Sequence, residues 1–166
     1  MIYISNEHTC CFLGHRNIPA SLQIKNDVYS LVIDLIVNRG VDTFLFGSRS
    51  AFDRLCYDVV SQVKNEHPHI KRIYVRAEYP HIDNSYLAYL LQFYEETYFP
   101  DKILHAGKAS YIERNQEMIN KSMFCIVYYC KHTANKRSGT RIAFDYAKRK
   151  GSTIMNIAEN ISTDNY

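Results

Sequence analysis

The sequence predicts a single Rossmann-like α/β domain with three layers, in which helices cover both faces of a mostly parallel sheet. Short apolar runs alternate with amphipathic segments of helical period along the chain, as in βαβ units. The apolar runs are continuous, which is typical of strands buried on both faces. The 166 residues, 46% of them hydrophobic, suit one domain spanning residues 1–166.

Five main strands are expected. Each is a short apolar run bounded by glycine or polar residues, and the strongest is the fourth. Their predicted ranges are residues 9–13, 43–46, 70–75, 123–129 and 153–157. A minor strand is predicted at residues 102–105.

The helices are expected between these strands. The first begins at Ser21 and ends at Gly40, and the second stops before Pro68. Further helices are predicted over residues 85–98, 110–122 and 139–150. Residues 158–166 are expected to form a loose tail.

Composition narrows the class of protein. The five cysteines are odd in number and match no zinc spacing, so we expect free thiols, no metal site and no cofactor. The chain opens without a signal peptide and contains no apolar window of about twenty residues, so a cytoplasmic protein with no membrane partner is expected. A net charge of +3 argues against a nucleic-acid partner.

Polar and glycine clusters follow four of the predicted strands. They are Gly14-His15-Arg16, then Gly47-Ser48-Arg49-Ser50 ahead of Phe52-Asp53, then Arg76 with Glu78, and finally Ser138-Gly139-Thr140. Ligands of open parallel sheets bind at the carboxyl ends of the strands. Glycine lets a phosphate approach the backbone closely, and a helix N-terminus offers free N–H groups. Arginine can donate bidentate hydrogen bonds to a phosphate.

Each cluster also has a structural explanation. Gly14 and Gly47 could serve as tight turns, Ser50 as a helix N-cap, and His15 as a hydrogen-bonded structural residue. The convergence of four clusters on one sheet edge favours an anion-binding site. An aromatic run that includes Tyr86 could pack in the core or stack on a base.

Two stretches resemble a known family. The segment Thr9-Cys10-Cys11-Phe12-Leu13-Gly14-His15-Arg16 resembles the opening of YpsA-like proteins of the SLOG superfamily, which includes the DNA-processing protein DprA and the LOG phosphoribohydrolases. A later stretch is similar through Tyr111, Arg114-Asn115, Met118-Ile119, Ser138-Gly139-Thr140, Ala143, Tyr146-Ala147 and Gly151. The resemblance implies a Rossmann-like fold and a pocket for nucleotides or nucleotide-derived ligands.

The resemblance also implies a departure from LOG chemistry. LOG enzymes carry Pro-Gly-Gly-x-Gly-Thr-x-x-Glu, whereas this chain keeps Gly139-Thr140 and has Ala143 in place of the glutamate. Glycosidic cleavage requires a carboxylate, which alanine lacks. Asp53 or Glu78 could supply one from another strand end, and His15 is a further catalytic candidate.

The sequence therefore predicts a sensor-type domain that binds a nucleotide or a nucleotide-derived ligand. The alternatives are a hydrolase acting on the N-glycosidic bond of a nucleotide and, more weakly, a DprA-like nucleic-acid partner. Whether the protein is an enzyme, and whether it forms a homo-oligomer, are left open. The predicted ligand-binding residues are Gly14, His15, Arg16, Gly47, Ser48, Arg49, Arg114, Asn115, Ser138, Gly139 and Thr140.

Overall fold

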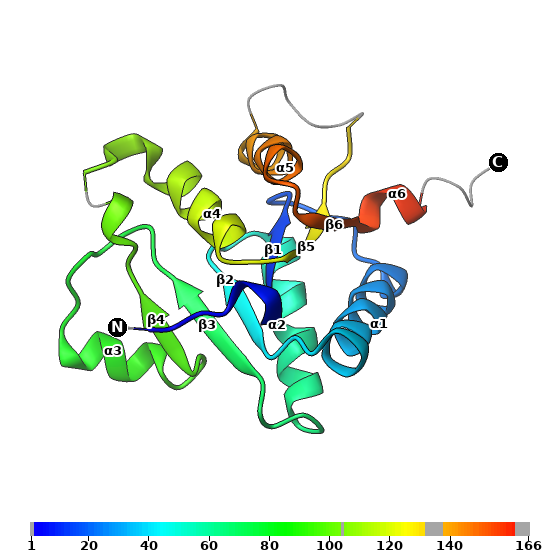
Figure 1. Cartoon of the computed structure of the whole chain (residues 1–166), viewed down its shortest axis with the longest axis horizontal. Helices are drawn as coiled ribbons and strands as arrows, with labels where there is room; N and C mark the ends of the chain where they lie inside the picture. Colours follow the sequence, from blue (N-terminus) through cyan, green and yellow to red (C-terminus); the bar gives the residue numbers. More distant parts are fainter. Residues whose placement is uncertain (1, 104, 132–137, 162–166) are drawn as a thin grey trace.

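The computed structural model describes residues 2–103, 105–131 and 138–161. Its six strands form one sheet in which every pairing is parallel. The sheet order is β4-β3-β2-β1-β5-β6 (Figure 1). The strands are β1 (Thr9–Gly14), β2 (Thr43–Phe46), β3 (Lys71–Val75), β4 (Glu96–Tyr98), β5 (Phe124–Tyr128) and β6 (Thr153–Asn156).

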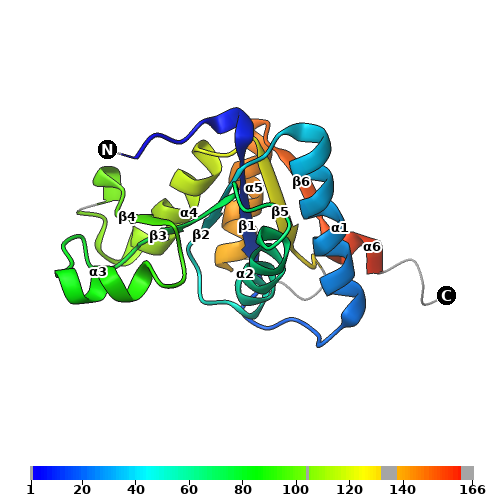
Figure 2. The ribbon, with the colours of Figure 1, turned by 90° about the horizontal axis from the view of Figure 1, so that it is seen from below.

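Helices cover both faces of the sheet (Figures 1 and 2). They are α1 (Leu22–Arg39), α2 (Ala51–Lys64), α3 (Asn84–Leu90), α4 (Ser110–Asn120), α5 (Gly139–Lys150) and α6 (Ile157–Ile161). Apolar residues of α1 and α2 form one core with one face of the sheet, and residues of α4 and α5 form a second core with the other face. The predicted three-layer, Rossmann-like α/β fold is confirmed, with six strands instead of five.

The order of the strands creates a switch point. The chain runs from β1 outward to β4, then returns to place β5 on the other side of β1. Loops that leave neighbouring strands β1 and β5 therefore diverge at their carboxyl ends, where α/β sheets bind ligands. Alternation along β1 also sends adjacent cysteines to opposite cores, Cys10 with α1 and α2, and Cys11 with α4 and α5.

Three sequence predictions need correction. The sequence predicts one helix over residues 85–98, but α3 ends at Leu90 and the last three residues form β4. The minor strand predicted at residues 102–105 is wrong, because Asp101–Ile103 is a short 3-10 helix and residue 104 lies outside the described residues. In the segment predicted to be a loose tail, residues 158–161 belong to α6, whose first residue Ile157 is fully buried against the core.

Three further findings concern the cysteines, the potential metal ligands and the membrane spans. All five cysteines are free thiols in the structure. Among the described residues, no group of three or more potential metal ligands occurs. None of the helices in the described part of the chain is long and apolar enough to cross a membrane.

Candidate functional site

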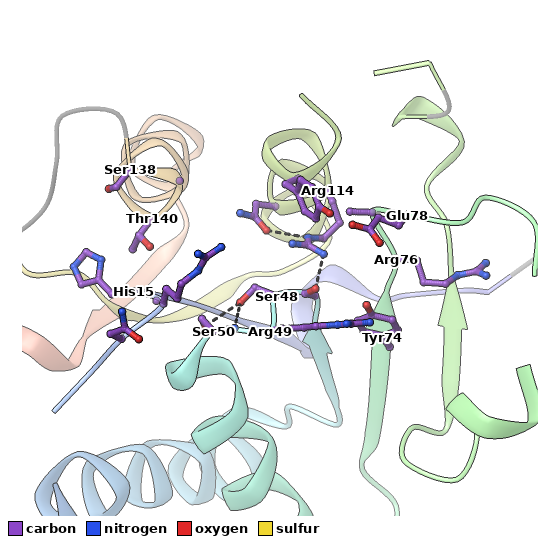
Figure 3. Close-up of a pocket in the computed structure, with 18 of the residues that line it drawn as sticks. His15, Ser48, Arg49, Ser50, Tyr74, Arg76, Glu78, Arg114, Ser138 and Thr140 are labelled. Carbon is purple, nitrogen blue, oxygen red and sulfur yellow. Dashed lines mark hydrogen bonds between the residues drawn. The ribbon is translucent and has the colours of Figure 1, made fainter. Parts of the chain in front are cut away.

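A cavity of about 970 Å³ opens at the carboxyl edge of the sheet (Figure 3). The loops after β1, β2 and β3 line it, together with the first turn of α5 and residues of α3 and α4. All eleven residues that the sequence nominates for ligand binding contribute to this lining: Gly14, His15, Arg16, Gly47, Ser48, Arg49, Arg114, Asn115, Ser138, Gly139 and Thr140.

The two ends of the cavity differ in chemistry. We call one the glycine end, defined by Gly14, His15, Ser138, Gly139 and Thr140, and the other the arginine end, defined by Arg49, Tyr74, Arg76, Tyr79 and Tyr86. In Figure 3, His15, Ser138 and Thr140 lie on the left and Arg76 lies on the right, with Ser48 between them.

Close packing explains two of the cavity glycines. A Cβ at Gly14 would lie 2.6 Å from the Cβ of Phe52, and a Cβ at Gly47 would lie 2.7 Å from atoms of Arg114 and Met118. Both distances are shorter than real Cβ atoms show. Gly139 is different, because a Cβ there would meet nothing within 4 Å. Packing therefore demands glycine after β1 and β2 but not at the start of α5.

The turn after β2 is held by serine hydroxyls. Ser50 caps α2, its side chain accepting a hydrogen bond from the backbone N–H of Asp53 at 3.0 Å. The hydroxyl of Ser48 donates to the Ser50 hydroxyl at 2.9 Å and accepts from the Ser50 N–H at 3.1 Å. The structural role expected of Ser50 is thus present, and Ser48 is fixed at the cavity wall.

His15 ties β1 to β5 at the switch point. Its Nε2 accepts a hydrogen bond from the N–H of Cys130 at 2.9 Å. An accepting Nε2 leaves the proton of the neutral ring on Nδ1. Burial lowers the pKa of His15 below its ordinary value, which also favours the neutral ring. His15 therefore combines a structural bond with a place on the cavity wall.

Arg114 connects α4 to the sheet. It is 3% exposed, and its Nη1 donates to the carbonyl oxygens of Gly47 and Val75 while its Nε donates to Asn115 Oδ1. The guanidinium also lies over the ring of Tyr111, 5.8 Å from its centroid. Arg114 thus braces the ends of β2 and β3. The sequence shows only that Arg114 lies in the middle of a predicted helix, so this role could not be predicted from it.

Asp53, a catalytic candidate, lies behind the turn after β2. It is 4% exposed, does not line the cavity, and its Oδ1 has no hydrogen-bond partner among the described residues. Burial raises the pKa of this carboxyl to about 8, against the opposing effects of Arg114 and the backbone of Gly47 and Ser48. Asp53 is therefore mostly protonated at neutral pH. Glu78, the other carboxylate candidate, is exposed and lines the cavity.

The arginine end contains residues outside the eleven predicted ligand-binding residues, although the sequence places Arg76 in a polar cluster after the third strand and Tyr86 in an aromatic run that could stack on a base. Tyr74, Arg76, Tyr79 and Tyr86 line the cavity there. Tyr79 is 58% exposed and has a φ of 59°, which non-glycine residues seldom adopt. The sequence shows that Arg76 follows the third strand, but only the structure shows that its side chain is buried.

Comparison with known proteins supports the fold. No family model matches the chain, and a search of curated proteins found no match. Among solved structures, the chain is similar to DNA processing protein A (DprA) from Streptococcus pneumoniae, with 17% sequence identity and a TM-score of 0.57. The similarity covers 93% of this chain and 53% of that chain. The fold is thus the one that the resemblance to the SLOG superfamily implies, and this chain spans about half the length of that structure.

Proposed function

We propose that this protein is a sensor-type domain that binds a nucleotide or a nucleotide-derived ligand through its phosphate. One observation carries the proposal: four clusters from distant parts of the sequence line a single cavity at the carboxyl edge of a parallel sheet. This is the edge where open α/β sheets bind ligands.

The glycine end has the features of a phosphate site. Ser138 caps α5 by accepting a hydrogen bond from the N–H of Arg141 at 3.1 Å. The N–H groups of Gly139 and Thr140 are the first two of the helix, so they have no acceptor within it. The open space at Gly139 lets a phosphate oxygen approach these groups, and the helix dipole favours its charge.

The proposal is tested by mass spectrometry of small molecules released from freshly purified protein. The expected result is a nucleotide or nucleotide derivative in an amount comparable with that of the protein. Isothermal titration of protein freed of such molecules should then show saturable binding of AMP, GMP, CMP or UMP. Absence of both a released nucleotide and any binding would overturn the proposal.

A hydrolase that cleaves the N-glycosidic bond of a nucleotide is the second candidate, because Glu78 places a carboxylate on the cavity wall. Two observations weigh against it. Asp53 lies behind the wall in a mostly protonated form, and Ala143, which stands at the LOG glutamate position, is 2% exposed in the core under α5. We expect little or no free base in a release assay over the four nucleoside monophosphates. Efficient turnover that disappears in Glu78→Gln would favour the enzyme.

A further inference from the structure

The guanidinium of Arg76 is buried with two nitrogens that lack a hydrogen-bond partner among the described residues. The residue is 8% exposed, and neither Nε nor Nη1 has a hydrogen-bond partner in the described part of the chain. No carboxylate among the described residues forms an ion pair with it. Burying an unpaired charged group is costly, because hydration is lost and nothing replaces it.

The other two largely covered arginines in the described residues are satisfied. Arg72 lies on β3, the strand that precedes Arg76. It makes a bidentate ion pair with Glu95 at 2.8 and 3.1 Å and donates to Ser61 at 3.0 Å. Arg114 donates to backbone carbonyls and to Asn115. Among the described residues, both of these covered guanidinium groups thus have acceptors within the protein, and Arg76 is the exception.

The exception lies on the cavity wall. Arg76 lines the arginine end, where Arg49 adds a second cation that is exposed. Burial lowers the pKa of Arg76 below its ordinary value, against the opposing effects of Tyr86 and Tyr74, which line the same cavity. Beside them the rings of Tyr79 and Tyr86 meet edge to face, with centroids 6.1 Å apart. Two cations and two aromatic rings are thus gathered in one place.

We propose that the arginine end binds a second anionic group of the ligand, separate from the phosphate held at the glycine end, with the base against Tyr79 and Tyr86. This inference rests on the proposed function and names its ligand class: a nucleoside with phosphates at its 3′ and 5′ positions. A phosphate oxygen at this end supplies the anionic partner that Arg76 lacks among the described residues, and its geometry matches the guanidinium fork.

The separation of the two ends favours phosphates on opposite sides of the nucleoside. Ser138 and Thr140 lie at one side of the cavity and Arg76 at the other, with the turn after β2 between them (Figure 3). Adjacent phosphates of a diphosphate share a bridging oxygen and stay together, so they would occupy one end. Phosphates on the 3′ and 5′ oxygens of a ribose are separated by the sugar.

The test is isothermal titration calorimetry of the full chain with three probes: AMP, ADP and adenosine 3′,5′-bisphosphate. We expect the bisphosphate to bind at least tenfold more tightly than AMP, and ADP to bind about as AMP does. In Arg76→Gln the advantage of the bisphosphate should vanish while AMP binding is retained. Arg76→Lys, which keeps the charge and loses the fork, should keep part of the advantage. The matched control is Arg39→Gln, which removes an exposed arginine at the far end of α1 and should change none of the affinities.

Each outcome decides. Equal binding of AMP and the bisphosphate by the wild type would overturn the inference and leave the proposed function standing. A loss of AMP and bisphosphate binding in equal measure in Arg76→Gln, with an unchanged melting temperature, would overturn it as well. Failure of every probe to bind the wild type would count against the proposed function itself. If Arg76→Gln does not fold, the ratio of bisphosphate to AMP affinity in the wild type and in Arg76→Lys carries the test.

Discussion

The side chains at the glycine end and at the arginine end of the cavity differ in their hydrogen bonding within the protein. At the glycine end His15 and Ser138 already have partners within the protein. At the arginine end the guanidinium of Arg76 is buried with two nitrogens unpaired among the described residues. The side chains of His15 and Ser138 are thus held in place without a ligand, whereas the guanidinium of Arg76 lacks acceptors among the described residues. The contrast indicates that one end sets the position of a ligand and the other distinguishes between ligands.

The largest change in stability should come from a substitution in the turn after β2, which lies between the two ends. Gly47→Ala would force a Cβ to within 2.7 Å of Arg114 and Met118, so the brace between α4 and the sheet must shift. Overpacking of this kind typically costs about 1–3 kcal/mol, and we expect a loss of about 3 kcal/mol in the free energy of unfolding. Urea denaturation measures it.

Gly139→Ala is the matched control for that variant. The added methyl group meets open space, and alanine suits the first turn of a helix. Its free energy of unfolding should stay within about 0.5 kcal/mol of the wild type. Equal destabilisation by both substitutions would show that packing does not separate the two glycines.

The next effect concerns the carboxyl of Asp53 behind the same turn. Its pKa is about 8 in the folded protein, against 3.8 for an ordinary aspartate. Between those values the folded state holds a proton that the unfolded state lacks, so the free energy of unfolding falls as pH rises from about 4 to 8. From pH 6 to pH 9 this amounts to roughly 3 kcal/mol.

Asp53→Asn removes this titration while keeping the shape of the side chain. The variant should match the wild type near pH 6 and be more stable than it at pH 9, as measured by thermal or urea unfolding at each pH. A wild type whose stability relative to Asp53→Asn stays constant over that window would show that the carboxyl is already ionised in the folded protein.

A smaller effect is expected from a charge placed at the glycine end. Gly139→Asp puts a carboxylate where the phosphate would approach, so nucleotide binding should weaken by about tenfold, equivalent to about 1.4 kcal/mol. Gly139→Ala should bind as the wild type does. Together with Arg76→Gln, this variant sharpens the comparison, because Gly139→Asp should weaken AMP and the bisphosphate alike. Undiminished AMP binding by Gly139→Asp would place the phosphate elsewhere.

The fold was predictable where burial leaves a pattern in the sequence. Strands such as β2 and β5 are covered on both faces and appear as unbroken apolar runs. Strand β4 has three half-buried residues at the sheet edge, and it follows α3 within one aromatic stretch. So short an edge strand carries no period that distinguishes it from the helix before it.

The site was predictable in its location but not in the state of its groups. Glycine and serine clusters after the strands identify the edge, because topology alone brings the strand ends together. Sequence does not separate Gly14, which packs against Phe52, from Gly139, which faces open space. It also cannot show that Arg76 lacks an acceptor among the described residues or that Asp53 is protonated, because both depend on which side chains cover them.

The most direct measurement of the proposed site is a crystal structure of the protein grown with adenosine 3′,5′-bisphosphate. The expected structure has one phosphate at the N-terminus of α5 beside Gly139, the second on Arg76, and the base against Tyr79 and Tyr86. A bisphosphate bound outside the cavity, or a cavity left without ligand at a saturating concentration, would contradict the proposed site.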